Sequence, residues 1–345
     1  MALTIVSDFH HGSLYHSLIL LLEERLGHTL LRQIGMDWFT EGIWLIGRPY
    51  PQPRITAEQY LGLDHRKWDA YKALNADYRL EDGIYHLYDP TNDVFHKAIT
   101  LDQFKEMDID IVLSTYAPHD ETFARLINDF KPNAKHVAQL GNIGQNTNVK
   151  NVLCFNGVRR REGAHWLDYH QEFDLNVFYP EPPKFHKHIT SFVIDLPRRD
   201  LYEHYKGAMP DYEFRAHGGN NSPDGNITFM TQIAHIMRES SFGWHVKPRG
   251  DGYGHCLHNW YACGRPVITS FNDYKAYSGG RLLEDGVTAI DLDSKKPEQV
   301  MEEIRFFSDP ERHKWMCDNA YRRFKEVVDF ERDSRNVAAF LEKLV

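Results

Sequence analysis

The sequence has few cysteines, and their spacing suits no familiar metal or redox motif. Four cysteines occur among the 345 residues, Cys154, Cys256, Cys263 and Cys317, and no two of them form a C-x-x-C pair. This spacing excludes a zinc ribbon and a thioredoxin-like site. We expect buried free thiols in a reducing compartment, and hence a cytoplasmic protein.

The sequence has no long apolar run and no excess of positive charge, and we expect no secretory leader. Its first twelve residues, MALTIVSDFHHG, already contain an aspartate and two histidines, unlike a signal peptide. The apolar stretch LYHSLILLLEERLG (14–27) carries three charged residues and is too short to span a membrane. The formal net charge of −9 gives no general attraction to nucleic acid or to anionic membranes. These absences predict a soluble protein.

The length and composition indicate about two globular domains. Hydrophobic residues make up 42% and charged residues 26%, without repeats or low-complexity tracts. The best candidate linker is the proline-rich segment VFYPEPPKFHK. We predict an N-terminal domain over 1–180, a linker over 181–187, a second domain over 188–318, and C-terminal helices over 319–345 that pack back on the first domain.

Strand and helix patterns alternate on both sides of this linker. The strand LTIV, the loop SDFHHGS and the helix LYHSLILLLEERL, ended by Gly27, form a βαβ opening. An insertion at about 37–101 is rich in aromatic residues and proline, and we expect loops and short helices there. Regular patterns resume at 108–115 and again at 189–196. The alternation predicts an α/β fold with two Rossmann-like domains, whose parallel sheets face a central cleft.

One segment of the second half combines a glycine loop, a helix and a strand. In DGYGHCLHNWYACGRPVIT (251–269), Gly252 and Gly254 flank Tyr253, and a helix follows that ends before Gly264. Glycines let the backbone approach a ligand, and the first amides of a helix can bind an anion. The pattern predicts a phosphate-binding unit, although such glycines also serve close packing of a helix on a sheet.

Polar side chains flank this loop. Lys247 and Arg249 lie at the carboxyl end of the preceding strand, where ligands bind in open α/β sheets. Asp251 and Asn259 are eight residues apart and can both point toward a ligand. The basic pair predicts contact with a phosphate, and the alternative is a solvated basic edge.

As a set, these motifs resemble the donor-binding segment of retaining GT-B glycosyltransferases. The segment 240–270 is similar to that family's Glu-Gly-Phe-Gly loop, its second glutamate and its Ala-Cys-Gly-x-Pro-Val motif. SGGRLLEDGVTAIDLD (278–293) is similar to its Gly-Gly…Glu…Asp-Gly-x-x-Gly segment, and 309–333 to its closing helices. LLEERLGHTL (21–30) matches the end of its first helix. The likeness covers 191–333 well and the N-terminal half at scattered points.

The resemblance implies roles for the matching residues. Asp251 stands where the family has a glutamate that contacts the donor sugar, and Asn259 where it has the glutamate that binds the ribose hydroxyls. An amide binds a hydroxyl less strongly than a carboxylate does, which leaves the nucleotide open. The resemblance places Gly252, Tyr253 and Gly254 in the diphosphate loop, and Ser278, Gly279 and Gly280 near the donor sugar. The family's basic pair lies among Arg198, Arg199, Lys206, Lys247 and Arg249.

The resemblance also implies the chemistry. A basic pair would stabilise the leaving nucleoside diphosphate as negative charge develops on it. In our reading of the strands, no Asp-x-Asp motif falls at the end of one. We therefore expect catalysis without a metal ion or another cofactor. The expected reaction transfers a sugar from a nucleotide-diphosphate sugar to an acceptor hydroxyl with retention of configuration. The expected donor is a UDP-sugar.

Polar residues of the first half lie where this family contacts the acceptor and the donor sugar. Gly12, in SDFHHGSLYH, is the expected close-approach glycine. His119 or Gln139 would contact the donor sugar. Three residues are candidates for the acceptor base: Asp8, His10 and Asp120. Each of these could instead be a surface polar residue.

The acceptor stays open among a glycan, a lipid and a modified base in DNA. The segment ESSFGWHVKP…ACG loosely resembles phage DNA α-glucosyltransferase, and VRRREGAHW (158–166) is a basic and aromatic patch that could contact phosphates. The same architecture would also suit a sugar-nucleotide 2-epimerase, which needs no acceptor, or a non-catalytic nucleotide-sugar sensor. A nicotinamide-dependent dehydrogenase is disfavoured because the first βα loop has a single glycine.

Overall fold

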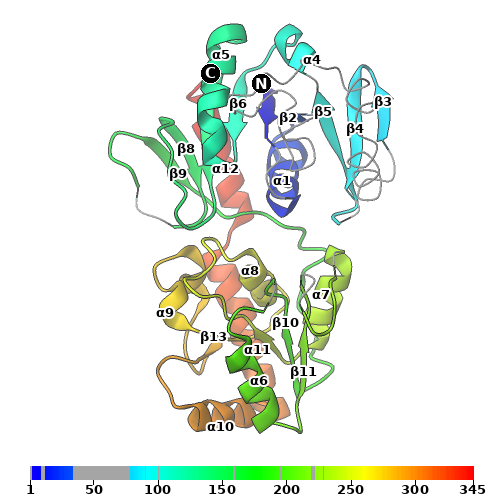
Figure 1. Ribbon diagram of the computed structural model, residues 1–345, viewed down its shortest axis with the longest axis vertical. Coiled ribbons are helices and arrows are strands. Elements are labelled where there is room, and N and C mark those ends of the chain that lie inside the picture. The colour runs from blue at the N-terminus through cyan, green and yellow to red at the C-terminus, as the bar shows by residue number, and fades with distance from the viewer. Residues whose placement is uncertain are drawn as a thin grey trace. The chain divides into compact units, whose positions relative to one another are not determined.

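The computed structural model describes residues 2–8, 12–33, 78–89, 91–99, 101–157, 160–194, 196–218, 222–227 and 229–345 (Figure 1). The chain divides into two compact units. Unit 1 comprises Met1–Phe155, Arg159–Phe173 and Phe330–Val345, and unit 2 comprises Asn156–Val158 and Asp174–Asp329. Residues 181–187, the expected linker, therefore belong to unit 2.

Unit 1 is built on a nine-stranded sheet in the order β3-β4-β5-β2-β1-β6-β7-β8-β9. From β5 to β9 neighbouring strands are parallel, and β3 and β4 add an antiparallel edge. The strands are β1 (Thr4–Ser7), β2 (Thr29–Gln33), β3 (Tyr78–Glu81), β4 (Ile84–Asp89), β5 (Val94–Ile99), β6 (Ile111–Ser114), β7 (Lys135–Leu140), β8 (Asn151–Cys154) and β9 (His165–Asp168).

The described end of the insertion is strand rather than loop and short helix. Residues 78–99 form β3, β4 and β5, which extend the sheet beyond β2. Asp82 and Gly83 connect β3 to β4 with positive φ angles of 49° and 79°. An Asp-Gly pair between two strands is typical of a β-hairpin. The aromatic residues around Asp82-Gly83 make this hairpin hard to recognise from the sequence. Residues 37–77 lie outside the described residues.

The helices of unit 1 include one π-helical segment. The predicted first helix begins as α1 (Gly12–Leu18) and continues as the π-helix η1 (Ile19–Arg25), after which Gly27 adopts the predicted positive φ, 66°. The segment DETFARLINDF (120–130) forms α5 (Asp120–Phe130). The other helices in the described part of unit 1 are α4 (Leu101–Glu106), η2 (Ala117–His119) and α12 (Phe330–Glu342).

Unit 2 is built on a five-stranded parallel sheet in the order β11-β10-β12-β13-β14. The strands are β10 (His188–Ser191), β11 (Glu213–Ala216), β12 (Phe242–Trp244), β13 (Val267–Thr269) and β14 (Ala289–Asp291). The helices are α6 (Arg199–Ala208), α7 (Met230–Glu239), α8 (His255–Ala262), α9 (Phe271–Tyr274), η3 (Ser278–Leu282), α10 (Pro297–Phe307) and α11 (Pro310–Val327). The predicted parallel α/β architecture is confirmed in both units.

A glycine in β12 lets α8 lie directly on the sheet of unit 2. A Cβ atom added to Gly243 would be 2.6 Å from the ring of Trp260, which is fully buried. The indole therefore occupies the space that a side chain at position 243 would take. This contact fixes the start of α8 relative to the carboxyl end of β12, where the candidate site lies.

The cysteines and the helices bear on the expected location of the protein. All four cysteines are free; Cys154, Cys263 and Cys317 are buried, and Cys256 is half-buried. Among the described residues, no helix combines the length and the apolar character that crossing a bilayer requires. The cytoplasmic location stays a prediction.

Candidate functional site

The loop between β12 and α8 has an unusual backbone. Arg249, Gly250, Gly252 and Gly254 all have positive φ angles, of 68°, 77°, 60° and 75°. Gly254 is the N-cap of α8, and no side chain in the described part of the chain caps this helix end. Helix α8 then ends at Ala262, and Gly264 has a φ of 66°. The predicted loop–helix–strand unit is confirmed, and its helix presents uncapped amides at its first turn.

An internal ion pair spans this loop. The ammonium of Lys247 contacts the carboxylate of Asp251, and the two side chains are 42% and 25% exposed. The backbone closes around the pair, because Gly250 donates its N–H to the Lys247 carbonyl at 2.9 Å and Gly254 donates to the Asp251 carbonyl at 3.1 Å. Arg249 donates its N–H to Asp273 Oδ1 at 2.8 Å, and its side chain is exposed. Lys247, Arg249 and Asp251 thus lie together at the carboxyl end of β12.

The segment at the start of η3 packs against this loop. A Cβ atom added to Gly279 would be 3.4 Å from the carbonyl oxygen of Tyr253, and one added to Gly280 would be 2.4 Å from the carbonyl oxygen of Tyr274. Ser278 donates its N–H to the Asn156 carbonyl at 3.1 Å. The structure therefore places the segment of Ser278, Gly279 and Gly280 against the glycine loop, and contact of these residues with a donor sugar stays a prediction.

Three buried side chains beside the loop carry polar atoms that have no hydrogen-bond partner among the described residues. Both ring nitrogens of His245, the hydroxyl of Tyr274 and Oδ1 of Asn259 are unpaired, although the three residues are at most 2% exposed. The rings of His245 and Tyr274 lie 5.5 Å apart between centroids. Buried polar atoms without a partner are rare, and each one points to an ordered water or a ligand. No pattern in the sequence singles out His245 or Tyr274, because the family motif names neither position.

Burial lowers the pKa of His245 to about 4, an effect that nearby Lys247 reinforces and Asp251 opposes. The unfolded chain, with a pKa near 6.5, therefore binds a proton that the folded protein does not bind between about pH 6.5 and 4. We expect His245 to make unfolding easier as the pH falls through this window, by up to about 1.4 kcal/mol per pH unit.

Urea unfolding at several pH values measures this effect. His245→Gln should retain stability between pH 6.5 and 4 better than the unaltered protein does, and the two should depend equally on pH above 7. Parallel curves from pH 8 to 4 would contradict the assignment.

The basic residues around α6 lie at two different places. Arg198, with a φ of 62°, is the N-cap of α6, and exposed Arg199 is its first residue, so both follow the carboxyl end of β10. Lys206 is in the last turn, with its ammonium 6.0 Å from the ring centroid of Tyr202. Ten helical residues span about 15 Å, so α6 carries Lys206 away from the carboxyl ends of the strands, toward their amino ends. Lys206 therefore does not lie at the site with the other basic candidates.

In unit 1, Asp8 and His119 form a hydrogen-bonded pair at the ends of β1 and β6. Asp8 is fully buried, and its Oδ1 accepts from both the backbone N–H and the hydroxyl of Thr115, each at 2.6 Å. Its Oδ2 lies 2.7 Å from His119 Nδ1. A carboxylate only accepts, so this nitrogen carries the proton, and in a neutral His119 ring Nε2 is the acceptor. The pair has the arrangement of an oriented general base.

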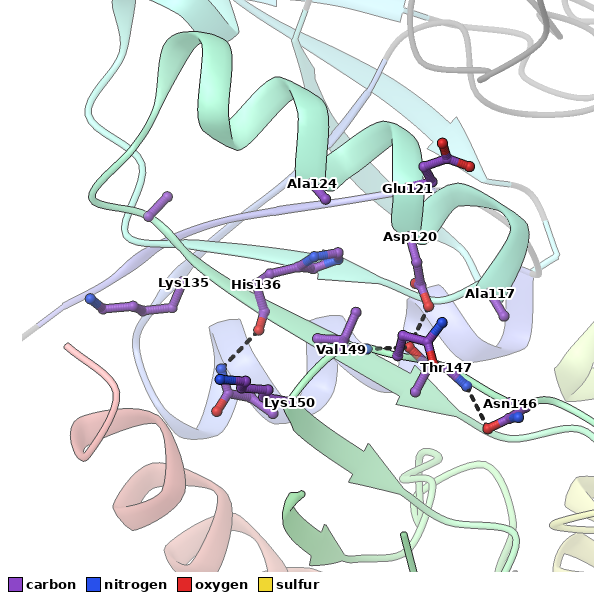
Figure 2. A pocket seen from close by; sticks show the side chains of 13 residues that line it. Ala117, Asp120, Glu121, Ala124, Lys135, His136, Asn146, Thr147, Val149 and Lys150 are labelled. Atoms are coloured by element: carbon purple, nitrogen blue, oxygen red, sulfur yellow. Dashed lines mark hydrogen bonds between the residues drawn. The ribbon is translucent and has the colours of Figure 1, made fainter. Parts of the chain in front are cut away.

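A second polar network lies beside this pair. The hydroxyl of Ser114 donates to Asp120 Oδ1 at 2.5 Å and lies 3.2 Å from His136 Nε2, and the hydroxyl of Thr147 donates to Asp120 Oδ2. Burial raises the pKa of Asp120, against the effect of these two hydrogen bonds, and burial lowers the pKa of His136 to about 4. Asp120, His136 and Thr147 line a groove of about 760 Å³, shown in Figure 2.

The other candidates of the first half differ in their surroundings. A Cβ atom added to Gly12 would meet nothing within 4 Å, so no described neighbour requires glycine there. Gln139 is buried in β7 and donates to the Leu140 carbonyl at 3.2 Å. His10 lies outside the described residues.

In the basic and aromatic patch of 158–166, the described residues Arg160, Arg161 and Trp166 make internal contacts, whereas Val158 and Arg159 lie outside the described residues. Arg160 pairs with Asp168 at 2.7 Å, and Trp166 Nε1 donates to the same carboxylate at 2.8 Å. Arg161 donates to the carbonyls of Thr147 and Val149. These side chains stabilise the protein locally, which weakens the case for a DNA-binding surface here.

One expectation about carboxylates is wrong. Asp291 ends β14 and Asp293 follows it, which makes an Asp-x-Asp at the end of a strand. Asp291 Oδ1 accepts from the Phe271 N–H at 3.2 Å, and Asp293 Oδ2 accepts from the Asn272 N–H and the Ser270 hydroxyl at 2.8 and 2.7 Å. Both carboxylates thus bind the first turn of α9.

The chain is similar in structure to several glycosyltransferases. Anabaena HepE, solved with UDP-glucose, aligns over 99% of this chain and 99% of its own, with a TM-score of 0.65 and 11% identity. Sucrose-phosphate synthase of Thermosynechococcus elongatus gives the same coverage, TM-score and identity. The pneumococcal O-GlcNAc transferase GtfA, solved with UDP and GlcNAc, aligns over 100% of this chain and 99% of its own, with a TM-score of 0.60 and 8% identity. This chain has the GT-B fold.

At these identities the likeness extends to the fold and no further. No protein-family model and no curated sequence matches the chain. The chemistry itself has to be argued from the residues.

Proposed function

We propose that the protein is a glycosyltransferase that moves a sugar from a nucleoside-diphosphate sugar, preferentially a UDP-sugar, to an acceptor hydroxyl. The observation that carries the proposal is the uncapped start of α8, preceded by the glycine loop and by Lys247. Backbone amides at a helix start and an adjacent ammonium are what a diphosphate requires. HepE, whose chain aligns from end to end with this one, binds UDP and UDP-glucose.

In the proposed donor complex, the diphosphate lies at the start of α8 and replaces Asp251 as the partner of Lys247. The freed carboxylate of Asp251 then accepts hydrogen bonds from hydroxyls of the donor sugar. Lys247, joined by Arg249 or by Arg198 and Arg199, stabilises the charge that develops on the leaving diphosphate. These cations would make a metal ion unnecessary.

In the proposed acceptor step, His119 accepts a proton from, or orients, the acceptor hydroxyl through Nε2. Asp8 holds the ring and stabilises the imidazolium that forms. No protein nucleophile is assigned, and the sugar is transferred with retention. Asn259 would bind a ribose hydroxyl through its unpaired Oδ1, which is buried in α8.

A thermal-shift panel of UDP, GDP, ADP and their sugars tests the donor. Binding to the native state stabilises it by RT ln(1 + [L]/Kd), about 2.7 kcal/mol at one hundred times Kd, and we expect the largest rise in Tm with UDP compounds. Lys247→Gln should reduce the shift, whereas Lys343→Gln, a change at an exposed lysine of unit 1, should leave it intact. No shift with any nucleotide would refute the proposal.

Product analysis separates a transferase from an epimerase and from a sensor. A 2-epimerase would convert the sugar nucleotide without an acceptor, and a sensor would bind it unchanged. A transferase should slowly hydrolyse the donor when no acceptor is present, and should lose this activity in Asp251→Ala.

A further inference from the structure

The groove in unit 1 exists because one connection lacks a helix. Parallel strands are usually joined by a helical crossover that covers the sheet. Here residues 141–150 run from the carboxyl end of β7 to the start of β8 without helix or strand. The face of the sheet beside α5 is left uncovered, and the groove of about 760 Å³ occupies this place, within the usual size range of ligand sites.

The two ends of the groove differ in chemistry. Lys135 and Lys150 line it where β7 and β8 begin, and Ala117 and Asp120 line it where β6 has ended. Figure 2 shows Lys135 far from Asp120 and Ala117, with His136 and Val149 between them and Thr147 beside Asp120. The groove therefore runs along the strands, from two ammonium groups toward the end of β6 that also carries His119.

The lining between these ends is polar and already held in place. Arg161 anchors the backbone of Thr147 and Val149, and the Thr147 hydroxyl accepts from the Val149 N–H at 3.0 Å. Asn151 Nδ2 donates to the His136 carbonyl at 3.0 Å. Because the lining is fixed by internal bonds, a ligand need not order it on binding, which favours affinity.

The polar groups of the lining suit hydroxyls. Each oxygen of Asp120 accepts one hydrogen bond from the protein and keeps lone pairs for a ligand donor. Asn146 and Asn148 add amide groups that both donate and accept. A chain of sugar rings offers hydroxyls along its whole length, and a negative charge at one end would match the lysines.

We propose that this groove binds an acidic oligosaccharide, an extended chain of sugars whose carboxylate or phosphate lies against Lys135 and Lys150. This inference rests on the proposed function in one respect: the ligand is then the acceptor, with a hydroxyl near Asp120 presented toward His119. The binding site itself requires no donor.

Binding of three probes by titration calorimetry tests the inference. The probes are oligogalacturonate tetramer, its fully methyl-esterified neutral form, and maltotetraose carrying a phosphate. We expect the acidic probes to bind at least about 10-fold more tightly than the ester, with an advantage that declines as salt rises. Comparison of the two acidic probes distinguishes a carboxylate from a phosphate as the charged group.

Two variants locate the site. Lys135→Gln/Lys150→Gln should remove the preference for acidic probes, whereas Lys105→Gln/Lys343→Gln, which takes the same charge from unit 1 outside the groove, should retain it. Ala124→Trp, which fills the groove from α5, should weaken binding of every probe. Circular dichroism and thermal unfolding confirm that each variant folds.

Equal binding of neutral and acidic probes, binding unaffected by Ala124→Trp, or no binding at all would overturn the inference. A single-stranded oligonucleotide that binds more tightly than the acidic sugars would also overturn it, in favour of nucleic acid. The nucleotide panel fails or succeeds independently: oligosaccharide binding without any nucleotide shift would refute the proposed function and leave the groove assignment intact.

Discussion

Replacing Asp8 by asparagine is expected to lower the rate of donor hydrolysis and of sugar transfer by about 10²–10⁴-fold. The amide can still accept from Thr115, but its NH₂ then faces His119 Nδ1. That contact favours the tautomer with the proton on Nε2, which can no longer act as a base. Donor affinity should change little, because the residues proposed to bind the donor belong to unit 2.

A matched variant separates this effect from loss of stability. Asp110 also accepts a backbone hydrogen bond in unit 1, from the Thr4 N–H at 2.8 Å, but at the amino end of β1. Both Asp8→Asn and Asp110→Asn should lower the free energy of unfolding by about 1–3 kcal/mol. Only Asp8→Asn should abolish activity at a temperature where both are folded. An equal loss of activity in the two would show that Asp8 serves the fold alone.

Replacing Gly250 by alanine is expected to destabilise the protein by about 3–5 kcal/mol and to weaken UDP binding by more than about 10-fold. Its φ of 77° strains any residue with a Cβ, by about 1–2 kcal/mol. The added methyl would also lie 2.2 Å from the Asp273 carbonyl oxygen, so the backbone on one side has to move. Movement here displaces Lys247 and Asp251, which are held by bonds to the same loop.

Gly225→Ala is the control for this experiment. Gly225 has nearly the same φ, 80°, lies in unit 2, and would place its Cβ with no atom of the described residues within 4 Å. Gly225→Ala should lower the free energy of unfolding only by the cost of the positive φ angle, about 1–2 kcal/mol, and should leave UDP binding intact. If the two variants lose equal stability and equal affinity, the close approach at Gly250 has no role.

The elements that can be predicted from the sequence are those whose signals lie within a few residues of one another. Helix α5 has an acidic first turn and an amphipathic pattern, and α8 is bounded by Gly254 and Gly264. Aromatic residues and prolines elsewhere in the insertion suggest loops, and they hide the strands β3 to β5. Lys206 is close in sequence to Arg198 and Arg199 and is therefore grouped with them by the sequence, but Arg198 and Lys206 lie at opposite ends of the ten-residue helix α6.

Individual site residues can be predicted from the sequence, but the contacts between them cannot. Asp8 and His119 are 111 residues apart, and only the parallel pairing of β1 with β6 brings them together. Likewise, the position of His245 against Tyr274 depends on how α9 packs beside β12, which periodicity does not report. The groove depends on a helix that the 141–150 connection does not form, and a missing element leaves little trace in a sequence.

The last helix sets the order in which the molecule can fold during synthesis. Helix α12 completes unit 1: Phe340 stacks on His165 at 4.5 Å, Asp333 pairs with His170 at 2.6 Å, and Phe330 meets Phe173 edge to face at 5.4 Å. A ribosome delivers the N-terminal residues first. The strands of unit 1 therefore emerge before unit 2, whose residues extend to Asp329, and α12 emerges after it. Although it begins first, unit 1 is the last to be finished.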